Sequence, residues 1–282
     1  MTKEPTSIEG WKGGAMAFNS LLLSRSANLT AFRLAASRAP QQRGFRHSTK
    51  MSASLEKISF DGIPGFVGGP KDRPAVIVLQ EWWGVTDEIK DQAQHLSKLG
   101  NYRVMIPDLY KGAIGVDAEE ASHLMNNLDF KTAVEEIKTA AKWLRDSGSP
   151  KVGAIGFCMG GALTFLAAEY AAIDAAAPFY GTPPAELGHP DKIKVPVQAH
   201  VGENDAFEGF ADAKTVSSFV DKINAAGGSA KVFVYPGEGH AFMNAGEKIK
   251  EKMKTGNLPV GKKESQDAAW ERVLGFYKEH LG

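Results

Sequence analysis

Short apolar runs alternate along the chain with longer segments in which apolar residues recur every three or four positions. The apolar runs predict strands at 75–79, 102–106, 152–157, 175–179, 195–201 and 231–235. Helical spacing predicts helices at 86–99, 131–145, 159–170 and 212–226, one that opens at a capping box at 117–120, and a C-terminal helix with a stripe of Trp270, Val273, Leu274, Tyr277 and Leu281. Because the strands are apolar throughout and crossover-length helices separate them, the pattern predicts an α/β fold. We expect a mostly parallel central sheet with helices on both faces.

A cysteine lies where a predicted strand meets a predicted helix. Residues 156–161 read Gly-Phe-Cys-Met-Gly-Gly, which is typical of a nucleophile elbow in which Cys158 stands where serine is more common. Glycines are expected on both sides, because a nucleophile on so sharp a turn lies in strained backbone and its neighbours crowd one another. The turn also directs the sulfur to the start of a helix, whose free N–H groups stabilise a thiolate. An inert buried cysteine is the alternative, and the flanking glycines disfavour it.

A thiolate nucleophile needs a base, and the base needs a partner that fixes its tautomer. In enzymes that carry this elbow on a parallel sheet, the order along the chain is nucleophile, acid, histidine. Downstream of Cys158, Asp205 and His240 each follow the carboxyl end of a predicted strand. Ligands bind at that edge of such sheets. We therefore expect Asp205 to orient His240, and His240 to act as the base for Cys158.

Other residues compete for these roles. Glu203 and Asp174 are alternatives to Asp205, but Asp174 precedes its strand and should lie at the opposite edge of the sheet. His200 lies inside a predicted strand and His189 in a proline-flanked loop. Neither histidine is therefore preferred as the base.

Composition narrows the class of protein. The chain has 282 residues, with 33 Lys and Arg against 33 Asp and Glu, so its charge gives no field that would attract nucleic acid or an acidic membrane. It has one cysteine, so it forms no intrachain disulfide and no thiolate zinc finger. No apolar run approaches the length of a bilayer span. We expect a small-molecule substrate, no nucleic-acid or membrane partner, no metal and no cofactor.

The first fifty residues differ in composition from the rest. No Asp or Glu lies between Glu9 and Glu56, and the stretch is rich in Arg and Ser with apolar residues between them. This composition is typical of a mitochondrial transit peptide. We therefore predict a leader at 1–50, one α/β domain at 51–282, and a mitochondrial location. The alternative is that residues 1–50 form a disordered tail without a targeting signal. Met51 could also begin a cytosolic form.

Five segments carry recognisable motifs. They are 80–85 (Gln-Glu-Trp-Trp-Gly-Val), 107–110 (Pro-Asp-Leu-Tyr), 156–161, 202–205 (Gly-Glu-Asn-Asp) and 239–242 (Gly-His-Ala-Phe). In order and approximate spacing they resemble the motifs of the dienelactone hydrolase family, which has the α/β-hydrolase fold. The resemblance extends from about residue 60 to the end of the chain. Its most specific part is the combination of a cysteine elbow with an early glutamate.

The resemblance implies a carboxylic ester hydrolase with a Cys-His-Asp triad at Cys158, His240 and Asp205. It also implies that Glu81 pairs with the cysteine and influences when the thiol ionises. Glu81 ends a buried strand, where an unpaired carboxylate is unfavourable and a nearby thiol is a plausible partner. A solvated loop carboxylate is the alternative.

Further site residues follow from the elbow and from the resemblance. The elbow geometry makes the backbone N–H of Met159 one donor to the oxyanion, and the resemblance makes the N–H of Trp82 the second. Trp83 either forms an apolar wall of the substrate pocket or packs in the core. In the family's namesake enzymes, arginines grip the substrate carboxylate, one of them four residues after the catalytic histidine. That position is Asn244 here, and Lys111 offers a point charge in the loop after the 107–110 segment.

These features predict hydrolysis of an ester, lactone or thioester through a covalent acyl-enzyme. Because Asn244 replaces a cation, a neutral or larger substrate is at least as well supported as dienelactone itself. A glutamine amidotransferase is one alternative, but its histidine is followed two residues later by a glutamate, whereas Glu238 precedes His240 here. A non-catalytic binding protein with a hydrolase-like fold is the other.

Overall fold

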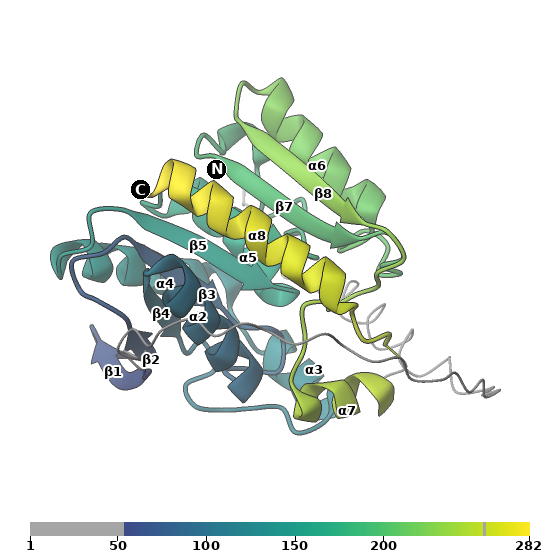
Figure 1. Ribbon diagram of the computed structural model, residues 1–282, viewed down its shortest axis with the longest axis horizontal. Helices are drawn as coiled ribbons and strands as arrows, with labels where there is room; N and C mark the ends of the chain where they lie inside the picture. The colour runs from purple at the N-terminus through teal and green to yellow at the C-terminus, as the bar shows by residue number, and fades with distance from the viewer. Residues whose placement is uncertain (1–53, 256–257) are drawn as a thin grey trace, which may run out of the picture.

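An eight-stranded sheet runs through the part of the chain that the computed structural model describes, residues 54–255 and 258–282 (Figure 1). The strands are β1 (Glu56–Phe60), β2 (Ile63–Gly68), β3 (Ala75–Leu79), β4 (Arg103–Pro107), β5 (Val152–Phe157), β6 (Ala175–Phe179), β7 (Val197–Gly202) and β8 (Ala230–Tyr235). Their order across the sheet is β1-β2-β4-β3-β5-β6-β7-β8. The pairs β1·β2 and β2·β4 are antiparallel, and all other neighbours are parallel. The predicted leader at 1–50 lies outside the described residues.

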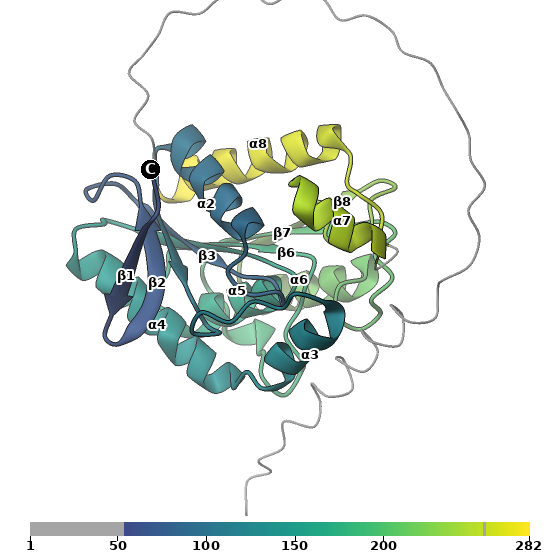
Figure 2. The ribbon, with the colours of Figure 1, turned by 90° about the horizontal axis from the view of Figure 1, so that it is seen from below.

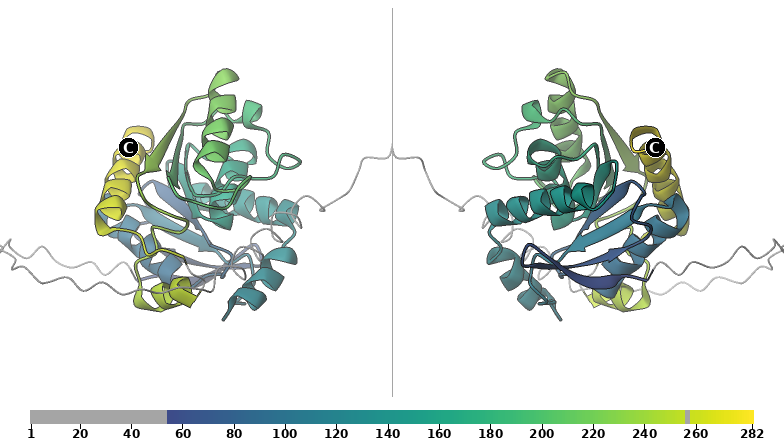
Figure 3. Two further views of the ribbon diagram at one scale, coloured as in Figure 1. Left: turned by 90° about the vertical axis from the view of Figure 1, so that its right-hand side faces the viewer. Right: turned by 90° about the vertical axis from the view of Figure 1, so that its left-hand side faces the viewer.

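Helices cover both faces of this sheet. They are α2 (Asp87–Gly100), α3 (Ala118–Asn126), α4 (Phe130–Asp146), α5 (Met159–Tyr170), α6 (Ala213–Ala225), α7 (Glu247–Thr255) and α8 (Lys263–His280), with a short 3-10 helix η1 (Pro190–Lys192). Helices α2 and α8 lie on one face, and α4, α5 and α6 lie on the other (Figures 2 and 3). The predicted α/β fold with a mostly parallel sheet is confirmed. Among the described helices, none has the length and apolar character of a membrane span.

The apolar pattern places the central strands and their helices. Every residue of β3, β4, β5 and β6 is buried, as expected for strands covered on both faces. In α4, the predicted face of Val134, Ile137, Ala141 and Leu144 is buried against the core. Helix α5 is buried from Met159 to Ala168, so it serves as the central helix of its layer.

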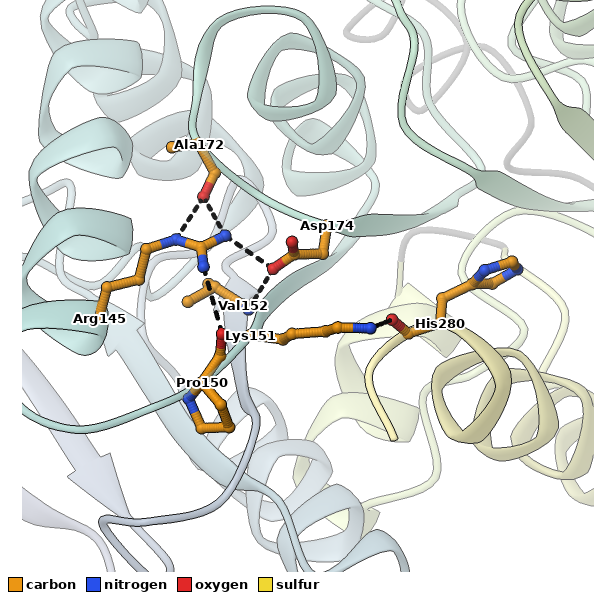
Figure 4. A network of polar contacts seen from close by, with 7 residues as sticks. All are labelled: Arg145, Pro150, Lys151, Val152, Ala172, Asp174 and His280. Carbon is orange, nitrogen blue, oxygen red and sulfur yellow. Dashed lines mark hydrogen bonds and ion pairs between the residues drawn. The ribbon is translucent and has the colours of Figure 1, made fainter.

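The C-terminal helix is fastened to the middle of the sheet by polar contacts as well as by its apolar stripe. The Tyr277 hydroxyl donates to the carbonyl of Ala154 in β5 at 2.8 Å. At the end of the helix, the Lys151 ammonium donates to the carbonyl of His280 at 2.8 Å (Figure 4). The C-terminal helix therefore packs on β5, although the two elements lie far apart in the sequence.

Four elements were not predicted from the sequence, namely β1, β2, α7 and the short 3-10 helix η1. The β1–β2 hairpin turns at Asp61-Gly62, where both residues have positive φ, 47° and 80°. An Asp-Gly pair is a strong signal for a two-residue hairpin turn, so the signal was present in the sequence. The flanking strands are only partly buried and lack the continuous apolar run of the central strands. Helix α7 buries only Ile249 and Met253 among its described side chains. Two apolar positions are too few to predict a helix from the sequence.

The amino-terminal edge of the parallel strands is held by a charged network (Figure 4). Arg145, at the end of α4, donates through Nη2 to the Asp174 carboxylate at 2.7 Å and through Nε and Nη2 to the carbonyl of Ala172. The same Asp174 oxygen accepts the backbone N–H of Val152 at 2.7 Å. Asp174 therefore lies at the edge opposite to the elbow, as its position before β6 predicted.

Replacing Asp174 should destabilise the fold through this network. The Asp174→Ala variant leaves the Val152 N–H without its acceptor and removes the ion pair of Arg145, which keeps only its bonds to backbone carbonyls. We therefore expect the free energy of unfolding to fall by about 1–3 kcal/mol. Urea unfolding followed by circular dichroism measures the change. Asp146→Ala, which breaks only the exposed ion pair with Lys142, should leave the curve nearly unchanged. Equal curves for Asp174→Ala and wild type would contradict this role.

Candidate active site

Cys158 lies on a strained turn between β5 and α5. Its backbone has φ 57° and ψ −116°, an unfavourable conformation for a residue with a side chain. Its N–H donates to the carbonyl of Phe179 at 3.1 Å, which ties the turn to β6. A Cβ on Gly156 would lie 2.1 Å from the carbonyl oxygen of Gly160, and a Cβ on Gly160 would lie 2.3 Å from that of Leu79. The predicted reason for the flanking glycines is therefore confirmed.

The three residues predicted to form a triad meet at the carboxyl edge of the sheet. The Nδ1 atom of His240 lies 2.7 Å from Oδ2 of Asp205, and both side chains are buried. The other oxygen of Asp205 accepts the N–H of Phe207 at 3.2 Å, which fixes the carboxylate. The imidazole of His240 also interacts with the Cys158 thiol, and each group shifts the pKa of the other. Because Nδ1 is engaged by Asp205, the nitrogen that faces the sulfur is Nε2.

Burial and the neighbouring charges shift the pKa values of Cys158 and His240 in opposite directions. Burial raises the pKa of the Cys158 thiol, while the charge and the hydrogen bond of His240 and the N–H of Met159 lower it. The charge of Glu81 raises the thiol pKa further. For His240, burial lowers the pKa of the imidazole, but the Asp205 carboxylate and the sulfur outweigh it and raise that pKa. The imidazole of His240 therefore favours the thiolate, whereas burial and the charge of Glu81 oppose it.

Glu81 is held by Asn244, not by a hydrogen bond to the thiol. Its carboxylate accepts from Nδ2 of Asn244 at 3.3 and 3.2 Å, and both side chains are buried. Burial raises the pKa of Glu81 from 4.5 to about 7, although the Asn244 bond and the charge of His240 lower it. An amide partner brings no positive charge, so it stabilises the carboxylate less than a cation would. The alternative of a solvated loop carboxylate is excluded, because Glu81 is 3% exposed.

The residues after Glu81 form a tight turn next to the elbow. The N–H of Gly84 donates to the carbonyl of Glu81 at 3.1 Å, and Trp82 is buried inside this turn. Since β3 pairs with β5 in register Leu79 to Gly156, the turn emerges beside the elbow. The rings of Trp82 and Trp83 meet edge to face with centroids 4.8 Å apart, and Trp83 packs against the core while half-buried.

Lys111 follows the 107–110 segment in a left-handed conformation with φ 55°. Its ammonium forms an ion pair with Glu136 of α4, and its side chain is about half exposed. The structure thus gives this cation a protein partner. Its contact with a substrate stays a prediction.

The competing candidates lie in other environments. His200 is fully buried in β7, where its ring stacks on that of Phe179 with centroids 4.2 Å apart and its Nδ1 forms a hydrogen bond with the Tyr235 hydroxyl. Burial lowers the pKa of His200 to about 3. His189 pairs with Glu169 at 2.8 Å.

The competing acids bind backbone groups. Glu203 accepts the N–H of Gly237 at 2.9 Å. Glu238 accepts the N–H of Lys262.

Several residues around the site were missed by sequence reasoning. Tyr180, just after β6, has φ 37° and places its ring 5.2 Å from that of His240. Its buried hydroxyl has no hydrogen-bond partner among the described residues. The ring of Phe207 packs against His240 at 4.5 Å, and the Tyr110 hydroxyl donates to the sulfur of Met159 at 3.3 Å. Tyr180 and Phe207 follow strand ends, which is the signal that could have indicated them.

Metal ligation finds no support in this region. Within the described part of the chain, no group of three or more His, Cys, Asp or Glu side chains is arranged to hold a metal ion. The cluster at Cys158 instead brings together a thiol, an imidazole and a carboxylate.

Comparison with known proteins identifies the family. The chain matches the dienelactone hydrolase family over residues 63–281. Protein usf of Aquifex pyrophilus is 32% identical over 235 residues, covering 78% of this chain and 94% of that protein. A carboxymethylenebutenolidase of Pseudomonas putida is 31% identical over 165 residues, covering 53% of this chain and 70% of that enzyme.

Solved structures give the same fold. A dienelactone hydrolase-like promiscuous phosphotriesterase from metagenomic libraries aligns with a TM-score of 0.66 at 21% identity, covering 81% of this chain and 99% of that one. These matches favour neither the amidotransferase nor the non-catalytic alternative. The chain therefore belongs to the dienelactone hydrolase family and is a hydrolase of the kind that cleaves esters and lactones.

Proposed function

We propose that this hydrolase cleaves an ester, lactone or thioester through a covalent acyl-enzyme on Cys158, with His240 as general base and Asp205 as the residue that orients it. The observation that carries the proposal is the chain of contacts from Asp205 through His240 to Cys158. An acid, an imidazole and a nucleophile in hydrogen-bond reach are the minimal apparatus for acyl transfer.

The reaction follows from these contacts. The Cys158 proton passes to Nε2 of His240, and the thiolate attacks the carbonyl carbon, so that a C–S bond forms and the carbonyl oxygen becomes an oxyanion. Collapse of this intermediate breaks the bond to the leaving group, which takes the proton from His240. Water then loses a proton to His240 and attacks the thioester, and the acid product leaves as the thiol is restored.

The oxyanion would be held by the N–H of Met159 and the N–H of Trp82. The Met159 N–H lies next to the nucleophile in the chain and lowers the pKa of the Cys158 thiol. It also opens α5, whose N-terminus favours negative charge. One donor of this kind is worth roughly 10²–10³ in kcat.

Glu81 would control when the thiol ionises. When its carboxylate is charged it raises the pKa of Cys158, and when it is protonated this opposition disappears. Because its own pKa lies at about 7, both forms are populated near neutral pH. The carboxyl group therefore acts on the nucleophile through its charge.

The substrate would be neutral near the reacting carbonyl. Asn244 stands four residues after His240, where namesake enzymes carry a carboxylate-binding arginine, and its amide is engaged by Glu81. The ammonium of Lys111 is engaged by Glu136. A substrate carboxylate at this position would meet the Glu81 charge without a free cation to balance it.

Removing the sulfur should abolish turnover. We expect Cys158→Ala to lower kcat/KM for a small aryl ester by at least about 10³-fold, because the nucleophile is lost while the oxyanion donors remain. Mass spectrometry of the wild type quenched during turnover should find the acyl group on the Cys158 peptide. Equal hydrolysis by the two proteins would overturn the assignment of the nucleophile.

The identity of the acid can be tested with a matched pair of variants. Asp205→Asn should lower kcat by roughly 10³–10⁴-fold, because the amide presents a donor to Nδ1 of His240 and favours the wrong tautomer. Glu203→Gln, two residues away, should keep nearly full activity, since Glu203 binds only the Gly237 N–H. Steady-state kinetics on one ester distinguishes the two acids. A larger loss in Glu203→Gln would reverse their roles.

The charge of Glu81 predicts a shift in cysteine reactivity. Above pH 7 the ionised carboxylate raises the thiol pKa, so Glu81→Gln should lower that pKa and move the pH midpoint of iodoacetamide alkylation of Cys158 downward. The amide can still bond Asn244, and Glu203→Gln serves as the control. An unchanged or higher midpoint in Glu81→Gln would show that Glu81 does not act on the thiol.

A further inference from the structure

We propose that Glu88 is a positioning residue, which holds a neighbouring loop in the place that lets Asn244 bond Glu81. This role rests on the proposed function, in which the charge of Glu81 controls the Cys158 thiol. Glu88 lies in the first turn of α2, and its side chain is buried although it bears a carboxylate. Burial of a carboxylate is unfavourable unless hydrogen bonds compensate it. The groups that bind Glu88 therefore indicate its role.

Both oxygens of Glu88 bind the loop that follows His240. Oε1 accepts the backbone N–H of Ala245 at 2.9 Å, and Oε2 accepts that of Gly246 at 2.8 Å. Because both oxygens belong to one planar group, the peptide between Ala245 and Gly246 is fixed in orientation as well as in position. Asn244 is the preceding residue, so the place of its side chain depends on the same contact.

Gly246 allows the carboxylate to approach the loop this closely. A Cβ on Gly246 would lie 2.4 Å from Oε2 of Glu88, whereas the next nearest atoms, in Glu88 and Ile249, would be 3.7 and 3.9 Å away. The latter are ordinary van der Waals distances. An alanine at this position would therefore displace the Glu88 carboxylate and little else.

One continuous segment of the chain holds three successive loop residues. The N–H of Gly84 donates to the carbonyl of Glu81 at 3.1 Å, and the turn so closed leads into α2 and Glu88. Asn244 bonds Glu81 of this turn, and the two residues after Asn244 bond Glu88. Loss of the bonds to Glu88 would therefore leave Asn244 free to move away from Glu81.

The loop is held differently on its other side. Gln266 of α8 donates from Nε2 to the carbonyls of Phe242 and Asn244, at 2.8 and 3.4 Å. These bonds fix the start of the loop and leave the backbone N–H groups of the next two residues to Glu88. The two helices thus hold different parts of the loop.

The same contacts place a negative charge at the start of α7. Gly246 directly precedes Glu247, the first residue of that helix, and negative charge is favourable at a helix N-terminus. Neither Ala245 nor Gly246 has a side chain that could cap the helix, so Glu88 supplies the acceptors from 158 residues earlier in the chain. Capping by itself would affect stability and not the protonation of Glu81, which separates the two roles.

The Asn244 bond limits the rise in the pKa of Glu81. Burial raises that pKa to about 7, and the Asn244 bond is the largest influence that lowers it, ahead of the charge of His240. The charge of Glu88 raises it by less than the Asn244 bond lowers it. Without this bond the Glu81 carboxyl would stay protonated to a higher pH, and its opposition to the Cys158 thiolate would vanish over that range.

The charge of Glu88 depends on the same contacts. Burial raises the pKa of Glu88, and the bonds from Ala245 and Gly246 lower it. Asp91 of the same helix raises that pKa and Lys250 of α7 lowers it, each by less than either bond. The loop therefore favours the ionised form of Glu88, as Glu88 keeps the loop in place.

Titration of Glu81 tests the proposal directly. Carbon-13 NMR of the full chain with labelled glutamate side chains follows the Glu81 carboxyl, whose signal is the one missing in Glu81→Gln. We expect a midpoint near pH 7 in the wild type. The midpoint should be higher in Glu88→Asp, which keeps the charge but withdraws it from the loop by one methylene group. Gly246→Ala, which changes no charge, and Asn244→Leu should raise it as well.

Asp91→Asn is the matched control, because it removes a negative charge from α2 and leaves the bonds of Glu88 intact. Its Glu81 midpoint should equal that of the wild type. A midpoint raised by Asn244→Leu but unchanged in both Glu88→Asp and Gly246→Ala would overturn the proposal, whatever happens to the melting temperature, since capping of α7 alone would give that result. The absence of a rise in Asn244→Leu would overturn it too.

A second background shows whether the effect on Cys158 passes through Glu81. Near neutral pH, Glu88→Asp should react faster with iodoacetamide at Cys158 than the wild type, because less Glu81 is ionised. In a Glu81→Gln background the same change should have no further effect. A gain that persists there would contradict the positioning role. If Glu81→Gln itself leaves the reactivity unchanged, the proposed control of the thiol fails, while the titration still decides whether Glu88 positions Asn244.

Discussion

The close approach of α5 to the strands beneath it is the constraint on which the site depends. Cys158 keeps its strained backbone only because Gly160 lets the first turn of the helix touch the carbonyl of Leu79 at the end of β3. The same contact brings the turn that starts at Glu81 beside the sulfur. The ends of β3 and β5 are therefore positioned together, and the N-terminus of α5 lies where the proposed mechanism develops negative charge.

Much of this arrangement could be predicted from the sequence, because its central part follows simple periodicity. The bounds of β3, β5, β6 and α5 agree with the predicted ranges, since continuous apolar runs and a fully buried helix leave little choice of environment. Cys158, Asp205 and His240 were found because each follows a strand end, and parallel strands bring such residues to one edge. Their convergence needed only the topology.

Partners that depend on side-chain packing could not be predicted. Asn244 was recognised as the place of a missing cation, but its bond to Glu81 depends on the path of a loop that no local pattern encodes. Tyr180 became part of the site through a positive φ that its sequence does not favour. The β1–β2 hairpin was overlooked because a weakly buried edge strand carries little periodic signal, although its Asp-Gly turn was visible.

The network around Arg145 and Asp174 has a consequence for how this fold can change over time. It ties α4, β5 and β6 together at the end of the sheet farthest from the chemistry (Figure 4). Loops at the catalytic end can therefore acquire new side chains while these tethers keep the strands in register. The same fold can therefore acquire new substrates by mutation, because the loops that contact a substrate are separate from the residues that hold the strands together.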